Sequence, residues 1–368
     1  MNFAQELANQ FSLQLWQTEK VIELIDEGNT IPFIARYRKE AHGSLDDQTL
    51  RGMAERLEYL RGLEKRREEV RGLIDAAGAL TPEVAASLDA ASTLAELDDI
   101  YRPFRPKRRT RASMAKEKGL EPLALLLLEQ KPQVDPLAEA AAYIDAEKGV
   151  ESAEEALAGA RDIIAESVSD DPSLRKRLRV VAMAQSDLVS KAAKPDEDSV
   201  YAQYYDFRQP VRQAAGHRVL AVDRGEREGF LKVSIELDRA RALSIVESVC
   251  VHGTSPSSQE VRTAAGDAYD RLIFPSLERE IRAALTEKAD EDAIKVFRVN
   301  LRQLLMQPPV RGKVAIGLDP GYRTGCKVAV VDATGRVLDT GVIYPTHSQT
   351  KKDEAARTLR RLIEKHGA

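Results

Sequence analysis

Apolar residues recur three and four positions apart through most of the first 310 residues, which is the spacing of amphipathic helices. The longest early stripe lies between Ser44, which with Asp47 predicts the helix start, and Gly78, which predicts its end. Thr81-Pro82 predicts another start, because an N-cap residue precedes a proline. Further helices are predicted near residues 120–130, 135–147, 152–168 and 172–191, each introduced by a cap or a proline.

A very long helical pattern then covers about residues 259–307. Pro275 lies inside this pattern and predicts a break or kink, because proline lacks the N–H that the helix needs. Pro308-Pro309 predicts the end of the helix. The expected fold class is therefore mainly α, with a multi-helical N-terminal region and a long connecting helix.

Shorter apolar runs between turn residues predict strands. Residues 217–223 and 230–237 flank a polar turn and predict a hairpin. Near the end, residues 313–318, 326–332 and 336–344 predict three antiparallel strands, and a basic helix is expected at 353–366. The mainly helical region should thus be followed by a small α/β piece.

Composition narrows the functional classes. The 55 basic and 59 acidic residues give a net charge of −4, so any nucleic-acid signal has to come from local clustering. Cys250 and Cys326 match no metal spacing, and a reducing, cytoplasmic location is expected. The chain contains no run of about 18 apolar residues, so no membrane span is predicted. The chain also lacks a Walker loop and a dinucleotide fingerprint, so we expect no cofactor and no small-molecule substrate.

The densest charge cluster is Tyr101–Gly119, YRPFRPKRRTRASMAKEKG. Pro103 and Pro106 predict that its first part is extended, so that successive guanidinium groups project along a backbone. An arginine donates two parallel hydrogen bonds to a phosphate. The alternative is a solvated loop whose arginines pair with Asp98 and Asp99, but so dense a cluster in an acidic chain favours contact with nucleic acid. The candidate phosphate-binding residues are Arg102, Arg105, Lys107, Arg108, Arg109 and Arg111.

A second basic segment is Thr30–Glu40, TIPFIARYRKE. Its apolar residues are expected to be buried, while Arg36 and Arg38 face outward as weaker candidates for nucleic-acid contact. On these residues alone, a structural corner whose arginines join two helices is the favoured interpretation.

Asp319 ends the first predicted C-terminal strand, within the turn Asp319-Pro320-Gly321. Three antiparallel strands with a carboxylate at the end of the first are typical of ribonuclease H-like domains, where such an aspartate helps to hold Mg²⁺. One carboxylate cannot form a two-metal site, so Asp319 is only a candidate catalytic residue. The glycines also resemble the phosphate-holding hairpin of sugar kinases and actin-like ATPases, and most such turns have no chemical role.

Four stretches together resemble the bacterial transcription accessory protein Tex family: residues 30–40, 97–124, 274–309 and 317–332. The resemblance implies a Tex-like N-terminal helical domain with a helix-turn-helix-like part (1–200), a central helical region ending in a long helix (201–310), and the start of a YqgF domain of ribonuclease H-like fold (311–368). Family members continue into helix-hairpin-helix motifs and an S1 domain. We therefore expect that the chain is a fragment lacking these modules, with an incomplete YqgF domain.

The leading hypothesis is a transcription accessory scaffold without catalysis, which contacts the backbone of RNA or DNA. One rival is a metal-dependent, junction-resolving nuclease that uses Asp319. The other is a protein-interaction scaffold whose long helices bind the transcription machinery.

Overall fold

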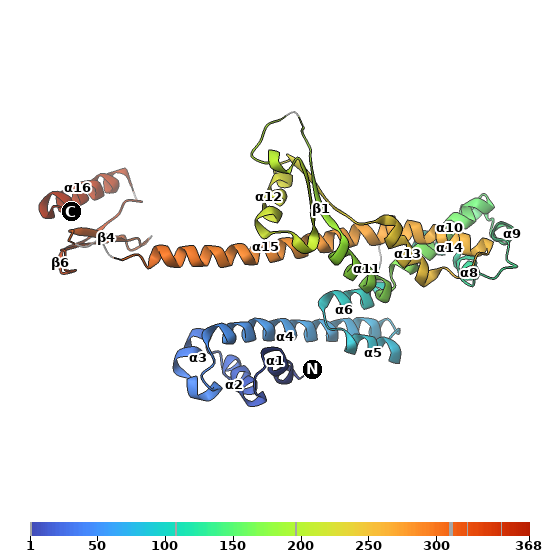
Figure 1. Cartoon of the computed structure of the whole chain (residues 1–368), viewed down its shortest axis with the longest axis horizontal. Helices are drawn as coiled ribbons and strands as arrows, with labels where there is room; N and C mark the ends of the chain where they lie inside the picture. Colours follow the sequence, from blue (N-terminus) through green and yellow to red (C-terminus); the bar gives the residue numbers. More distant parts are fainter. Residues whose placement is uncertain (1, 107–108, 196, 309–311, 322, 347) are drawn as a thin grey trace. The chain divides into compact units, whose positions relative to one another are not determined.

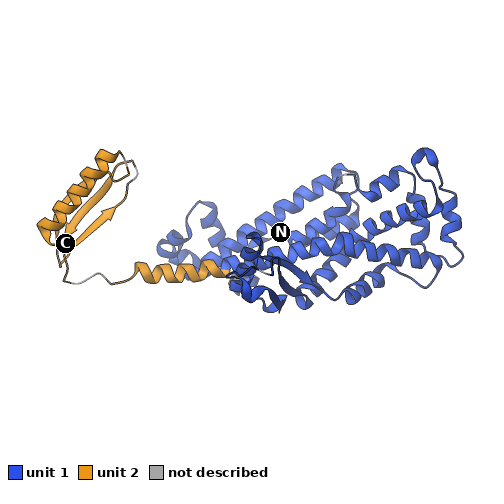
Figure 2. Cartoon of the chain, turned by 90° about the horizontal axis from the view of Figure 1, so that it is seen from above, with its two compact units in different colours: residues 1–291 blue, residues 292–368 orange. Residues whose placement is uncertain are grey.

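The computed structural model describes residues 2–106, 109–195, 197–308, 312–321, 323–346 and 348–368. They form two compact units, Met1–Glu291 and Asp292–Ala368 (Figure 2). The boundary falls inside one long helix, α15 (Phe274–Leu305). Among the described residues, none of the helices combines the length and apolar character that a bilayer span requires. The boundary that we predict between residues 200 and 201 stays a prediction.

The first unit begins with six helices, in which α1, α2 and α3 pack against one half of α4, and α5 and α6 pack against the other (Figure 1). Their bounds are α1 (Phe3–Phe11), α2 (Leu15–Asp26), α3 (Ile31–Tyr37), α4 (Asp47–Ala76), α5 (Pro82–Ala90) and α6 (Leu94–Tyr101). The predicted stripe on α4 is confirmed, because Leu50, Leu57 and Val70 are all buried. The helix starts later than predicted: Asp46 caps it by accepting a hydrogen bond from the Thr49 N–H at 2.9 Å, whereas Ser44 adopts a left-handed conformation.

The rest of the first unit is built on one continuous hydrophobic core. Its central helix is α10, which packs against α7, α8, α9 and α14. The helices are α7 (Arg111–Glu117), α8 (Glu121–Leu128), α9 (Pro136–Ala141), α10 (Ala153–Ser169), α11 (Pro172–Gln185), α12 (Gly216–Arg227), α13 (Arg239–Cys250) and α14 (Pro256–Asp267).

A three-stranded antiparallel sheet interrupts these helices, in the order β2 (Asp206–Pro210), β1 (Asp187–Ala192) and β3 (Leu231–Glu236). Two predictions were wrong here. Helix α11 ends at Gln185, and the residues predicted to continue it form the central strand β1. The predicted strand 217–223 belongs to helix α12, so β3 pairs with β1 instead.

A polar contact with α15 explains why residues 217–223 form part of helix α12 and not a strand. The guanidinium of Arg282 on α15 lies 2.9 Å from an Asp223 carboxylate oxygen and 2.6 Å from one of Glu226. Two residues three apart share a face on a helix and lie on opposite faces of a strand. Only the helix therefore brings both carboxylates to Arg282.

The helical pattern is irregular just before Pro275, but the break that we predict there does not occur. Helix α14 runs through a π-helical turn, Ala268–Ile273, directly into α15. Proline cannot donate to the carbonyl four residues earlier, and its ring crowds that carbonyl. The wider π turn takes up this misfit while the helical path continues.

The C-terminal residues of the second unit confirm the predicted strands and helix. The sheet has the antiparallel order β4 (Ala315–Asp319), β5 (Cys326–Val331) and β6 (Val337–Ile343). Helix α16 (Gln349–His366) buries Ala355 and Leu362 against Val328 and Val330 of the central strand. The mainly α fold class with a small α/β part is thus confirmed.

Candidate nucleic-acid interface

The arginine-rich loop, residues 102–110, connects the end of α6 to the start of α7. Residues Arg102–Phe104 continue the helix as one 3₁₀ turn, so the prediction that Pro103 makes this part extended was wrong; its fixed φ also suits a helical turn. The extended backbone begins at Arg105, with φ −66° and ψ 132°. The loop ends at Thr110, which caps α7 by accepting a hydrogen bond from the Ser113 N–H at 3.0 Å.

Two of the candidate arginines, Arg105 and Arg109, project from this loop, and a third, Arg111, is the first residue of α7. Arg105, Arg109 and Arg111 are exposed, and in the described part of the chain none of their side chains has a hydrogen bond or an ion pair. The charge of Arg111 still reaches Asp162: burial raises the pKa of that carboxyl, and Arg271 and Arg111 oppose the rise. Lys107 and Arg108 lie outside the described residues.

Arg102 differs from these three. Its Nε donates to an Asp170 carboxylate oxygen at 3.2 Å, and its side chain is 35% exposed. The contact links the start of the loop to the end of α10, so Arg102 holds the loop in place and is less available to a phosphate. Asp170 is 68 positions away, and no local pattern indicates this pairing.

The alternative pairing of the loop arginines with Asp98 and Asp99 does not occur among the described residues. Asp98 lies 2.8 Å from the guanidinium of Arg66 on α4. Asp99 lies 2.7 Å from Arg175 and 2.8 Å from Arg179, both on α11. Other arginines therefore occupy both carboxylates.

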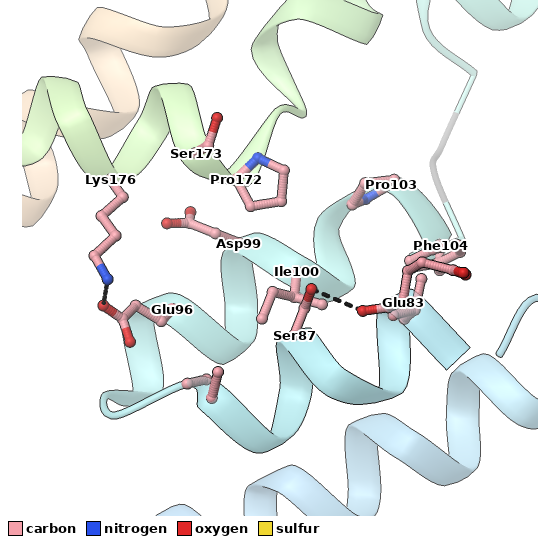
Figure 3. Close-up of a pocket in the computed structure, with 13 residues that line it drawn as sticks. Glu83, Ser87, Glu96, Asp99, Ile100, Pro103, Phe104, Pro172, Ser173 and Lys176 are labelled. Carbon is pink, nitrogen blue, oxygen red and sulfur yellow. Dashed lines mark hydrogen bonds and ion pairs between the residues drawn. The ribbon is translucent and has the colours of Figure 1, made fainter. Parts of the chain in front are cut away.

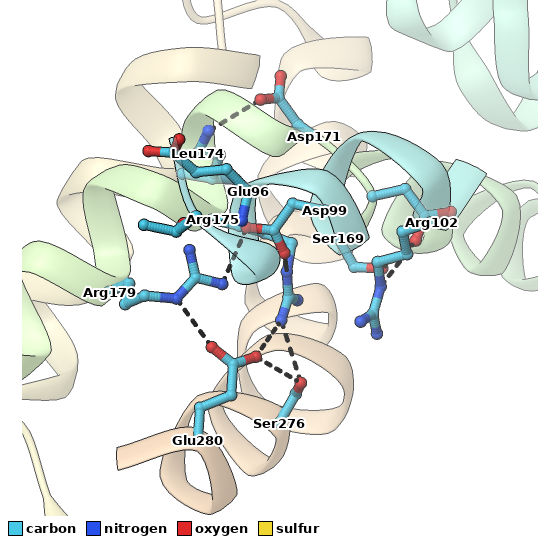
Figure 4. Close-up of polar contacts among 12 residues, drawn as sticks. Glu96, Asp99, Arg102, Ser169, Asp171, Leu174, Arg175, Arg179, Ser276 and Glu280 are labelled. Carbon is cyan, nitrogen blue, oxygen red and sulfur yellow. Dashed lines mark hydrogen bonds and ion pairs between the residues drawn. The ribbon is translucent and has the colours of Figure 1, made fainter. Parts of the chain in front are cut away.

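Asp99 belongs to a partly buried ion-pair network that joins α6, α11 and α15 (Figure 4). Arg175 Nη2 donates to Ser276 Oγ and to Glu280 Oε1, each at 3.0 Å, and Arg179 Nε donates to Glu280 Oε2 at 2.9 Å. Burial acts to raise the pKa of Glu280, but Arg179 and Arg175 outweigh it and hold that pKa below its usual range. Sequence reasoning missed this network; its one local signal is that two arginines four apart share a helix face.

A cleft of about 490 Å³ lies beside the loop, between α5, α6 and the start of α11 (Figure 3). Ile100, Phe104 and Pro172 give it a largely apolar lining. At one end, Lys176 Nζ lies 2.7 Å from a carboxylate oxygen of Glu96. The cleft can accept an apolar group, and it holds no cluster of metal ligands among the described residues.

The second basic segment forms α3 and the 3₁₀ turn Lys39–His42. Arg36 and Arg38 are exposed, and the guanidinium carbon of Arg38 lies 5.1 Å from the centre of the Phe33 ring. Neither arginine joins two helices through an ion pair within the described residues. Because α3 and α6 pack against different halves of α4, the structure does not bring the two basic segments together (Figure 1).

Asp319 is exposed at the end of β4. Its cross-strand neighbour on β5 is Lys327, a cation, and the described residues contain no group of three or more His, Cys, Asp or Glu that could hold a metal ion. A two-metal site needs several converging carboxylates. The residues around Asp319 therefore do not fit the Mg²⁺ ions of a ribonuclease H-like centre.

Three family models match the chain. The Tex-like protein N-terminal domain matches residues 1–75, the Tex central region-like model matches residues 131–297, and the Tex protein YqgF-like domain matches residues 313–368. The segment around α3 lies inside the first match. The arginine-rich loop lies between the first and second matches.

Curated relatives agree with these matches. The chain is 44% identical over 367 residues to the uncharacterized protein YdcI of Bacillus subtilis, covering 98% of this chain and 51% of the relative. It is 40% identical over 375 residues to the transcriptional accessory protein Tex of Neisseria gonorrhoeae, covering 100% and 49%. It is 29% identical over 360 residues to the human S1 RNA-binding domain-containing protein 1, covering 93% and 36%. The chain thus spans about half the length of the two bacterial relatives.

Proposed function

Because the chain belongs to the Tex family of transcription accessory proteins, we propose that it is a nucleic-acid-binding scaffold without catalysis, whose arginine-rich loop grips the phosphate backbone. The names of two relatives support the class of partner, since one is a transcriptional accessory protein and the other carries an S1 RNA-binding domain. Phosphate contacts hold a protein on the backbone and read little sequence, which suits an accessory role.

The observation that carries the proposal is a contrast between arginines. Arg51, Arg208 and Arg239 are also exposed, but each pairs with a carboxylate, of Asp47, Asp187 and Asp270 respectively. Arg105, Arg109 and Arg111 have no such partner among the described residues. A guanidinium without a carboxylate can give its paired donors to a phosphate without first breaking an ion pair.

Titration of labelled RNA and DNA at several salt concentrations tests the proposal. If the five basic residues at 105–111 each neutralise one phosphate, log K should fall with log salt at a slope of about −3.5 to −4.5. Replacing Arg105, Arg109 and Arg111 by glutamine should reduce the size of this slope by about 2 to 3.

The matched control replaces Arg51, Arg208 and Arg239 by glutamine, which removes the same charge from exposed but paired positions. This control variant should bind nucleic acid slightly less tightly, because it loses the same positive charge, and it should keep most of the salt slope. Equal slopes for the two triple variants, or an unchanged affinity of the loop variant, would refute the role of the loop.

A further inference from the structure

We propose that the cleft between α5, α6 and α11 is a docking site for a segment of another protein, which inserts a large apolar side chain and places a lysine or arginine beside Glu83 (Figure 3). The inference goes beyond the proposed function and does not rest on it, because none of the candidate phosphate-binding residues lines the cleft. The cleft volume of about 490 Å³ lies within the range of about 300–1,000 Å³ that is usual for binding pockets.

One wall of the cleft is apolar and firmly seated. Val84 of α5, Ile100 of α6 and Phe104 after α6 line the cleft, and all three also pack against the buried cluster that contains Leu88 and Leu97. Each of the three is only partly buried, so one side of it rests on the core while another side faces the cleft. A ligand that covers this fixed apolar surface gains the free energy of removing it from water.

The opposite wall, at the start of α11, is held by ion pairs. Pro172 and Lys176 line this wall. Lys176 Nζ lies 2.7 Å from a Glu96 carboxylate oxygen, and the buried guanidinium of Arg175 lies 2.7 Å from an oxygen of Asp99. Both carboxylates belong to α6, so these contacts hold α11 against α6. The cleft is therefore formed in advance, and little conformational freedom is lost when a ligand enters it.

The carboxylates that line the cleft indicate the charge of the ligand. Glu96 and Asp99 already have cations within 2.8 Å. Glu83, on the first turn of α5, is exposed and has no cation partner among the described residues. It lies at the opposite end of the cleft from the Lys176–Glu96 pair (Figure 3). The uncompensated charge of the lining is thus negative, and it favours a cationic group on the ligand.

A protein segment combines the apolar group and the cation that the cleft fits. Large side chains that fill preformed pockets are the usual anchors of protein interfaces. A helix presents an apolar residue and a basic residue three or four positions later on one face, so both reach the same cleft. A nucleotide or another anionic metabolite would instead meet the carboxylate of Glu83, while Lys176, the cation in the lining, is already paired.

The proposal is tested with a phage-displayed library of random 12-residue peptides, selected on the full chain and counter-selected on Ser87→Trp. Ser87 is exposed and lines the cleft, so the tryptophan ring should fill the cleft without removing a core contact. The matched control is Ala86→Trp, because Ala86 is the preceding residue of α5, is exposed and does not line the cleft. We expect enriched peptides in which leucine, isoleucine or phenylalanine stands within four positions of a lysine or arginine.

Fluorescence anisotropy of the most enriched peptide, labelled with fluorescein, then measures its affinity for each variant, after far-UV circular dichroism has confirmed folding. We expect Ser87→Trp to weaken binding by about tenfold or more, and Ala86→Trp to leave it within about twofold. Glu83→Gln should weaken binding about threefold, as for other exposed ion pairs. Its matched control is Glu139→Gln, which removes an exposed first-turn acid of α9 outside the cleft and should leave the affinity unchanged.

Several results would overturn the docking site. They are a selection without peptides specific for the unfilled cleft, enriched peptides that lack a basic residue, and an affinity that Glu83→Gln does not alter. Nucleic-acid binding is measured separately on Ser87→Trp, which keeps the loop arginines, and its salt slope should match that of the original chain. The docking site can therefore fail while the role of the loop stands, and the loop can fail while peptide binding stands.

Discussion

The ion-pair network around Asp99 offers the sharpest test of the fold, because four charges balance within it and its central pair, Arg175 and Asp99, is buried. The side chains of Arg175 and Asp99 are 2% and 6% exposed. Arg175→Met removes the hydrogen bonds of Arg175 to Asp99, Ser276 and Glu280, yet both carboxylates keep Arg179 within 2.9 Å. Breaking a buried ion pair costs about 3–5 kcal/mol, and since Arg179 remains, we expect about 3 kcal/mol.

Asp99→Asn removes a negative charge from the network, whereas Arg175→Met removes a positive one. Arg175 and Arg179 then share the single carboxylate of Glu280, and the network carries a net positive charge. We again expect a loss of about 3 kcal/mol in the free energy of unfolding. The double variant leaves Arg179 and Glu280 as a balanced pair, so its loss should fall short of the sum of the single losses by about 2 kcal/mol.

Urea unfolding measures these free energies. Circular dichroism follows all helices, while fluorescence of Trp16, the only tryptophan, follows the N-terminal helices. Coinciding transitions would justify a two-state treatment. Single losses below about 1 kcal/mol, or additive losses in the double variant, would refute the argument that these four side chains form a coupled unit around a buried ion pair.

Two further predictions concern single carboxylates. Hydrogen bonds from Lys176 and from the Ser92 N–H lower the pKa of Glu96 to about 2 from its ordinary 4.5. The ionised form therefore stabilises the fold above pH 4.5, and this stabilisation is lost as the pH falls toward 2. Between pH 4.5 and 2, the urea midpoint should therefore fall more steeply with pH for the original chain than for Glu96→Gln. If the midpoints of the two proteins fell in parallel, the lowered pKa of Glu96 would be contradicted. For Asp319, we expect no Mg²⁺- or Mn²⁺-dependent cleavage of RNA, DNA or a four-way junction; cleavage that disappears in Asp319→Asn would instead establish the nuclease.

Helices were predictable where their signal is local. The apolar stripe on α4 recurs in consecutive turns of that helix. Thr81 and Ser152 lie directly before the helices that they cap, and they accept hydrogen bonds from the N–H groups of Val84 and Glu155. An irregularity near Pro275 was also predictable from that single residue, although its form, a π turn, was not. In each case, the residues that decide the structure lie within one or two turns of one another.

The sheet was not predictable in this way. Strand β1 pairs with β2 and β3, whose partner residues lie 15 to 49 positions away along the chain. The sequence of β1 itself continues the helical pattern of α11. Helix α12 was mistaken for a strand because Val219–Val222 is a continuous apolar run, which fits either structure. Only the tertiary partner, Arg282, distinguishes them.

The candidate interface shows the same limit. The sequence located the basic loop, but it could not say which arginines lack partners, because those partners are distant: Asp170 for Arg102, and Asp99 for Arg175. The apolar cleft beside the loop was equally hidden, because α11 lies far along the chain from the other two helices that line it. Burial and long-range pairing decide these roles, and neither is encoded in local spacing.

The two ends of the loop explain why free arginines can form a defined site. At its start, Asp99 is held by Arg175 and Arg179, and Arg102 is held by Asp170. At its end, Thr110 caps α7. The charges that fix the frame are therefore paired and partly buried, whereas Arg105 and Arg109 between them are exposed. A rigid frame limits the freedom that the arginines lose on binding a phosphate, so a weakened network should lower affinity through disorder even though no phosphate contact is removed.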